Sequence, residues 1–219
     1  MIPVFVVNYK AYPTSYGKIA EEIAKKASDL SSTGRIRIIL AVPATEVYRI
    51  SKIHEDTYIQ SVDSVIEGSY TGHITVEMAE EAGAKGVLLN HSEKKLLYRD
   101  IQSIIKVTRI ETLVCAETPE EAVAVSLLNP TMIAIEPPEL IGTGIPVSKA
   151  KPQVITDTVR LVRQHNTQSA ILTGAGISAP GDAIKAIQLG TQGVLVASAV
   201  MKAQNPLAKL EEFAEKMII

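Results

Sequence analysis

The sequence predicts an α/β protein that folds as a single-domain (β/α)₈ barrel. Eight short runs of apolar and β-branched residues recur along the chain, and stretches of helical periodicity lie between them. The length of 219 residues is ordinary for one barrel domain. No linker, charge block or low-complexity segment divides the chain, so we expect residues 1–219 to form one domain.

The eight expected strands are largely apolar and lack the polar alternation of a half-exposed sheet. This pattern is typical of strands that are covered on both faces, as in a parallel sheet. The strands are expected at residues 4–8, 36–42, 57–62, 86–91, 112–117, 132–136, 170–174 and 193–198.

Helical spacing of apolar residues separates these runs. It is clearest at residues 16–30, 73–84, 119–128, 151–165 and 180–190, and the last helix is expected at 205–219. A doubly wound open sheet is the competing architecture. Such a sheet usually shows a glycine-rich turn after its first strand, whereas here the first run leads into Tyr9 and Lys10. The barrel is therefore favoured.

Composition excludes several classes of function. Lys and Arg total 22 against 24 for Asp and Glu, so the net charge of -2 provides no extended field for nucleic acid or an anionic membrane. Cys115 is the only cysteine, which excludes an internal disulfide and fits a reducing compartment. No apolar run approaches the roughly 18 residues of a membrane span. We therefore expect a cytoplasmic protein that binds neither nucleic acid nor membranes.

Function in such barrels is found where the strands end, on the loops at their C-terminal mouth. After the first strand come Asn8 and Lys10, two residues apart, so both side chains point toward the mouth if the strand persists. A lysine that extends into solvent is the alternative.

The fourth strand ends in Asn90 and His91, followed by Ser92. If Ser92 caps the following helix, His91 lies in the positive field of that helix's N-terminus, which disfavours the charged imidazolium. A hydrogen-bonded structural histidine is the alternative interpretation.

The sixth strand ends in Glu136. A carboxylate in a largely apolar mouth loses solvation, which makes it a better proton acceptor, as a general base requires. A glutamate in a structural salt bridge is the alternative. Two prolines stiffen the segment that follows, whereas Gly142 and Gly144 loosen it, which is typical of a lid and also of an ordinary surface loop.

The last two strands end in TGAGIS, residues 173–178, and VASAV, residues 196–200. Their glycines and a short helix expected near Ser198 would let a phosphate group approach backbone N–H groups. Neither segment has the pattern of a dinucleotide fold or a P-loop.

Together these motifs resemble the triosephosphate isomerase family in its short archaeal form. The resemblance rests on VNYK (7–10), LLNHSEKK (88–95), AIEPPELIGTGIPVSKAKP (134–152), TGAGIS and GVLVAS (193–198), and it covers the whole chain. It implies interconversion of glyceraldehyde 3-phosphate and dihydroxyacetone phosphate without metal or cofactor. By the roles known for this family, Glu136 would be the base, His91 a neutral electrophile, and Lys10 a cation that offsets phosphate and enediolate charge.

The same resemblance implies the supporting residues. Asn8 would lie beside Lys10, and Glu93 would hold the lysine in place. The phosphate would be received by the backbone around Ile141, Gly142, Gly176, Ser178, Ala197 and Ser198.

A homo-oligomer is also implied, because EGSYTGH, residues 67–73, resembles a loop that family members insert into a neighbouring subunit. Tyr70 lies near the tip of this loop, and the sequence leaves dimer and tetramer both open. Two features depart from the family: Thr173 stands where a cysteine is expected, and QSVD follows the third strand where glutamine and histidine are more usual. The short chain also requires trimmed outer helices.

Two other functions remain open. A lyase or synthase that acts on a bulkier phosphate ester would also fit the last two strand ends, although the lid and NHSE segments argue against it. A non-catalytic barrel would be expected to have lost Lys10, His91 or Glu136, and all three are present.

Overall fold

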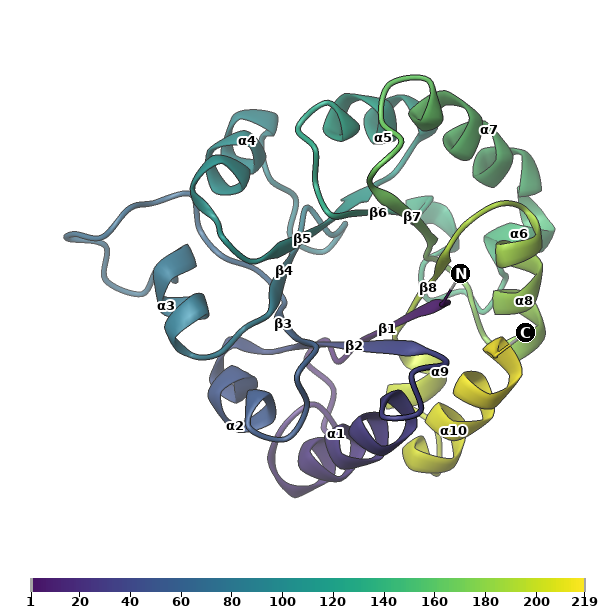
Figure 1. Ribbon diagram of the computed structural model, residues 1–219, viewed down its shortest axis with the longest axis horizontal. Coiled ribbons are helices and arrows are strands. Elements are labelled where there is room, and N and C mark those ends of the chain that lie inside the picture. The colour runs from purple at the N-terminus through teal and green to yellow at the C-terminus, as the bar shows by residue number, and fades with distance from the viewer. Residues whose placement is uncertain (1, 219) are drawn as a thin grey trace.

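A closed barrel of eight parallel strands forms the centre of the computed structural model, which describes residues 2–218 (Figure 1). Each strand pairs with the next, and β8 closes the barrel against β1. The predicted fold class is confirmed. The strands are β1 (Val4–Asn8), β2 (Arg37–Val42), β3 (Thr57–Ile59), β4 (Gly86–Leu89), β5 (Glu111–Ala116), β6 (Met132–Ile135), β7 (Ala170–Thr173) and β8 (Gly193–Val196).

Helices surround the barrel (Figure 1). They are α1 (Gly17–Ser31), α2 (Val47–Ser51), α3 (Val76–Glu81), α4 (Tyr98–Val107), α5 (Pro119–Ser126), α6 (Val147–Ala150), α7 (Pro152–Arg163), α8 (Pro180–Gln188), α9 (Ser198–Met201) and α10 (Pro206–Met217), with 3₁₀ turns η1 (Ala44–Glu46) and η2 (Pro138–Leu140). Trimming of the outer helices is evident in α2 and α3, which have 5 and 6 residues. Among residues 2–218, no helix combines the length and apolar character needed to cross a bilayer.

Two apolar layers follow from the alternation of side chains along each strand. In β1, Val6 points into the barrel, while Phe5 and Val7 pack outward against the helices. The ring of Phe5 stacks on Phe213 of α10, with 5.3 Å between centroids. The inner layer fills the barrel, so it is a packed core with no channel through it.

Polar side chains close the N-terminal end of the barrel. Arg37 forms ion pairs with Asp56 and Glu111, both at 2.6 Å. The hydroxyl of Tyr58 donates a hydrogen bond to Glu111, and burial together with this bond raises the pKa of the phenol. The tyrosine ring fits only because Gly86 has no side chain: a Cβ there would lie 2.4 Å from the ring. This network ties together the N-terminal ends of β2, β3, β4 and β5.

Candidate active site

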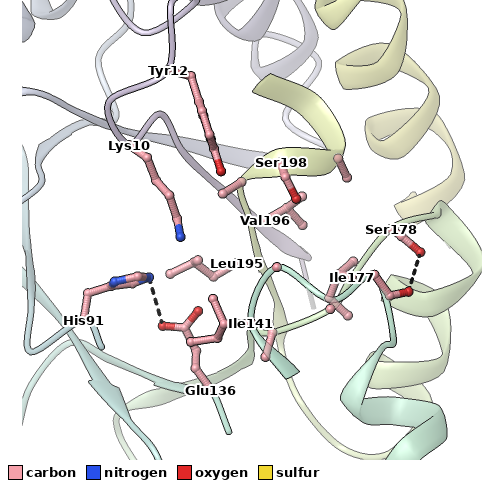
Figure 2. Close-up of a pocket in the computed structure, with 16 residues that line it drawn as sticks. Lys10, Tyr12, His91, Glu136, Ile141, Ile177, Ser178, Leu195, Val196 and Ser198 are labelled. Carbon is pink, nitrogen blue, oxygen red and sulfur yellow. Dashed lines mark hydrogen bonds and ion pairs between the residues drawn. The ribbon is translucent and has the colours of Figure 1, made fainter. Parts of the chain in front are cut away.

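A cavity of about 150 Å³ opens at the C-terminal mouth of the barrel (Figure 2). It is lined by most of the residues expected from the sequence, namely Lys10, His91, Glu136, Ile141, Gly142, Gly176, Ser178, Ala197 and Ser198. Asn8 and Glu93 line a neighbouring cavity of about 270 Å³, which shares Lys10 and His91 with the first. The structure thus brings together the predicted residues from five strand ends around two adjoining cavities.

Lys10 reaches the site from a turn that follows β1. The strand ends at Asn8, and Lys10 has a positive φ of 48°, so its direction is set by the turn and not by strand alternation. The backbone N–H of Lys10 donates to Asn8 Oδ1 at 3.0 Å, which stabilises this conformation. The ammonium lies 2.6 Å from Glu93 Oε1, the contact expected from the sequence. Figure 2 shows the side chain directed toward His91 and Glu136.

Gln60 holds the Lys10 turn in place, and sequence reasoning missed it. Its amide nitrogen lies 3.2 Å from Asn8 Oδ1 and 3.1 Å from the carbonyl oxygens of Lys10 and Ala41. A polar residue directly after a buried strand was the signal available. These contacts join the ends of β1, β2 and β3 under the lysine.

His91 is buried and is presented by the end of β4. Its Nδ1 accepts a hydrogen bond from the backbone N–H of Glu93 at 3.1 Å. Since Nδ1 accepts, the neutral ring carries its proton on Nε2. That nitrogen faces Glu136, with 3.8 Å between Nε2 and Oε2 (Figure 2).

The expected helix cap at Ser92 is wrong. Helix α4 begins only at Tyr98, and residues 92–97 form turns and extended chain. Asn90, with a φ of 59°, stabilises this path because its Oδ1 accepts the N–H of Leu96 at 3.0 Å. The group that contacts Nδ1 of His91 is therefore the backbone N–H of Glu93 and not the N-terminus of a helix.

Glu136 extends from the end of β6 into the cavity. Its side chain is buried, and within residues 2–218 its Oε2 accepts no hydrogen bond and pairs with no lysine or arginine. The structural salt bridge considered above is thus not formed by this part of the chain. Gly174 at the end of β7 makes the room, because a Cβ there would lie 2.4 Å from Glu136 Cγ.

Cys115 of β5 lies close below this carboxylate in the barrel. Burial raises the pKa of the Cys115 thiol well above its usual value, and the negative charge of Glu136 raises it further. The thiol is therefore uncharged and adds no second negative charge beside Glu136. Within residues 2–218, no cluster of three or more His, Cys, Asp or Glu side chains is arranged to hold a metal ion.

Residues 137–146, here called the lid segment, follow Glu136 and cover one side of the cavity. Gly142 and Gly144 have positive φ values of 73° and 74°. The far end of the segment rests on the backbone of the GAGIS loop, residues 174–178. A Cβ on Gly176 would lie 1.9 Å from the carbonyl oxygen of Ile145, so only glycine allows this contact.

The backbone N–H groups around the cavity are not equally available. Those of Ile141 and Ser178 donate to the Pro138 carbonyl and to Asp182 Oδ2, both at 3.2 Å. Those of Gly142 and Gly176 have no protein acceptor within residues 2–218. Ser198 begins the short helix α9, as expected, directly after Ala197. A ligand with several acceptor oxygens could bind these free donors.

A family model described as triosephosphate isomerase matches residues 3–215. The chain belongs to the triosephosphate isomerase family. It is 46% identical to the triosephosphate isomerase of Sulfolobus acidocaldarius over 99% of this chain and 95% of that protein. The enzyme of Methanocaldococcus jannaschii is 44% identical over 92% and 94% of the two chains. Membership rests on these matches across nearly the whole chain.

The fold agrees with that of a solved member. The crystal structure of triosephosphate isomerase from Bartonella henselae superposes with a TM-score of 0.73 at 19% identity, and the match covers 97% of this chain and 99% of that one. At this identity the likeness concerns the fold. Family membership makes this chain an intramolecular aldose-ketose isomerase that interconverts glyceraldehyde 3-phosphate and dihydroxyacetone phosphate.

Proposed function

We propose that Glu136, His91 and Lys10 carry out this isomerisation, with Glu136 as the base. It would remove a proton from one carbon of the triose phosphate and return it to the neighbouring carbon by way of an enediolate. The observation that carries the proposal is the convergence of the three groups on one cavity, where Glu136 Oε2 accepts no hydrogen bond within residues 2–218 and lies 3.8 Å from His91 Nε2. No cofactor takes part in these steps.

His91 is proposed to polarise the substrate oxygens. Removal of a proton beside a carbonyl puts negative charge on oxygen, and a donor fixed in advance lowers that barrier by ~3–4 kcal/mol. The Nε2–H of the neutral ring is such a donor, since the N–H of Glu93 already occupies Nδ1. The ring can donate this Nε2 proton to one enediolate oxygen and recover a proton from the other oxygen, so it ends each turnover in the form in which it began.

Lys10 is proposed to offset the negative charge of the phosphate and the enediolate. Its side chain is largely buried, so its charge is less screened than that of a surface lysine. Asn8 supports the turn, and Glu93 orients the ammonium from outside the cavity.

The phosphate is proposed to bind between the lid segment and the ends of β7 and β8. The free N–H groups of Gly142 and Gly176 support this position, as does the start of α9 at Ala197 and Ser198. Ile141 and Ser178 line the same part of the cavity. A lid held by the phosphate would also cover the enediolate, which in water would lose its phosphate.

We further propose that the chain acts as a homo-oligomer in the cytoplasm. The loop at residues 66–73 extends away from the barrel between β3 and α3 (Figure 1). Its Ile66 and Tyr70 are 70% and 47% exposed, which is unusual for large apolar side chains. The cavity lined by Asn8 and Glu93 adjoins the site and could receive the same loop from a second copy.

The proposed base is tested by Glu136→Asp in a coupled assay of glyceraldehyde 3-phosphate conversion. Shortening the side chain withdraws the carboxylate while leaving the phosphate contacts in place. We expect turnover to fall by about 10²-fold or more with a modest change in KM. Turnover equal to that of the unmodified chain would remove Glu136 from the mechanism.

A further inference from the structure

A buried carboxylate lies directly behind the GAGIS loop. Asp182, in the first turn of α8, accepts hydrogen bonds at Oδ2 from the N–H of Ser178 at 3.2 Å and the N–H of Ala179 at 3.0 Å. The hydroxyl of Ser178 donates to the same oxygen at 3.1 Å. Its side chain is 2% exposed. Asp182 therefore fixes the end of the loop whose Gly176 lines the cavity.

This arrangement has an electrostatic cost. A full negative charge lies next to a loop that is proposed to receive a phosphate dianion, and like charges repel strongly where water is excluded. A protonated Asp182 would avoid the repulsion. However, protonation would remove one of the lone pairs with which the carboxylate accepts hydrogen bonds, and Ser178 and Ala179 together supply three donors.

Lys149 of α6 supplies the compensating charge. Its ammonium forms an ion pair with Asp182 Oδ1 at 2.7 Å, and this oxygen accepts no hydrogen bond within residues 2–218. Burial by itself would raise the pKa of Asp182, but Lys149 and the N–H groups of Ser178 and Ala179 outweigh it and hold the pKa below its usual value. The carboxylate thus remains ionised at neutral pH. It pairs with the ammonium of a residue in α6, the helix that follows the lid segment.

Neighbouring residues of α6 set the position of this lysine. The N–H of Val147 donates to the carbonyl of Ala175 at 3.4 Å, and the hydroxyl of Ser148 donates to the carbonyl of Asp182 at 3.5 Å. Three consecutive residues of α6 therefore contact the GAGIS loop or the residue behind it. The hydrogen bonds of Val147 and Ser148 thus hold the helix turn that carries Lys149 against the GAGIS loop and Asp182.

We propose that Lys149 is a positioning residue of the phosphate site, which cancels the charge of Asp182 so that the GAGIS loop can accept a phosphate dianion. The inference rests on the proposed phosphate position. It assigns a role to α6, the helix that follows the lid segment: α6 carries the cation that offsets the negative charge behind the GAGIS loop.

The test is the inhibition constant of inorganic phosphate, measured against glyceraldehyde 3-phosphate for Lys149→Met. The ammonium of Lys149 is largely exposed, so its removal leaves the core intact. We expect the inhibition constant and KM to rise about tenfold, the effect of one uncompensated charge within roughly 10 Å, with kcat nearly unchanged. Lys149→Arg should restore both values.

Lys185→Met is the matched control. It removes the same charge from an exposed position in the last turn of α8, three residues after Asp182, and should change the inhibition constant less than about twofold. Equal effects of Lys149→Met and Lys185→Met would overturn the inference, because loss of any nearby positive charge would then be sufficient. Phosphate that fails to inhibit the unmodified chain would instead count against the proposed phosphate site.

The double variant Lys149→Met, Asp182→Asn separates charge from structure. An asparagine oxygen can still accept from Ser178 and Ala179, so removing both charges should return phosphate inhibition to within about threefold of the unmodified chain. If phosphate inhibits the double variant as weakly as it inhibits Lys149→Met, and the melting temperature is unchanged, Lys149 does not act through the charge of Asp182.

Discussion

The position of the Glu136 carboxylate depends on a neighbouring residue that has no side chain. A Cβ at Gly174 would lie 2.4 Å from Glu136 Cγ and 2.5 Å from Oε1. Such contacts cannot be relieved without movement of the carboxylate, because Gly174 is fixed by its N–H bond to the carbonyl of Ile135 at 2.9 Å. The glycine therefore defines where the proposed base can stand.

We predict that Gly174→Ala lowers kcat by about 10²-fold, since displacement of a reacting group by about 1 Å has an effect of that size. Gly181→Ala is the control: its added Cβ meets no atom within 4 Å, and it lies in helix α8, where alanine is favoured. Both are checked by steady-state kinetics. Equal turnover of the two variants would show that the Gly174 contact does not position Glu136.

The proposed catalytic residues could be selected from the sequence because each follows a buried strand. Lys10, His91 and Glu136 are polar residues at points where an apolar run ends, and barrel topology brings such points together. Gln60 also follows a buried strand, but its position alone does not reveal its contacts, and Gly174 has no side chain to mark it. Their importance comes from contacts with Lys10 and Glu136 that are remote in sequence.

The lid segment combines a stiff beginning with a flexible middle. Pro137 and Pro138 precede and open the turn η2, whereas Gly142 and Gly144 adopt backbone conformations that other residues rarely occupy. The Thr143 hydroxyl donates to the carbonyl of Leu140 at 2.8 Å and so closes the segment on itself. The segment is therefore held together by its own hydrogen bonds.

We predict that Gly144→Ala raises KM about fivefold, because a non-glycine residue with this positive φ is strained by ~1 kcal/mol or more. Gly34→Ala is the control, since Gly34 also has a positive φ and free space around it but lies remote from the cavity. It should lower the free energy of unfolding and leave KM unchanged. A KM for Gly144→Ala equal to that of Gly34→Ala would rule out strain in the lid.

Elements were predicted well where they are apolar and less well where polar residues decide the path. The strand expected at 57–62 ends at Ile59, because Gln60 turns its amide toward the Lys10 turn. The strand expected at 86–91 ends at Leu89, because Asn90 adopts a positive φ and binds the N–H of Leu96. In both cases a side-chain amide forms a hydrogen bond with the backbone of a loop. The periodicity of apolar residues does not reveal such a bond.

At the scale of the molecule, the polar network and the proposed active site lie at opposite ends of the barrel. Ion pairs and Tyr58 close its N-terminal end, and the cavities lie at the opposite end. The trimmed α3 leaves the loop at residues 66–73 extended from the barrel (Figure 1). An arm of this shape with exposed apolar residues is suited to contact a second copy.

We predict that Tyr70→Asp dissociates the proposed oligomer in sedimentation velocity, because a carboxylate buried at an interface without a partner is strongly unfavourable. Tyr70→Phe keeps the apolar ring and should sediment as the unmodified chain does. If the sedimentation coefficient of Tyr70→Asp stays unchanged, this loop is not the contact between subunits.

The role of Glu136 is tested most directly by exchange of the C1 proton of dihydroxyacetone phosphate in D₂O, followed by NMR. The unmodified chain should exchange this proton rapidly. Glu136→Gln, which keeps the shape but removes the base, should exchange it on the order of 10⁴-fold more slowly, with an unchanged inhibition constant for inorganic phosphate. Exchange by Glu136→Gln at the rate of the unmodified chain would contradict the proposed base.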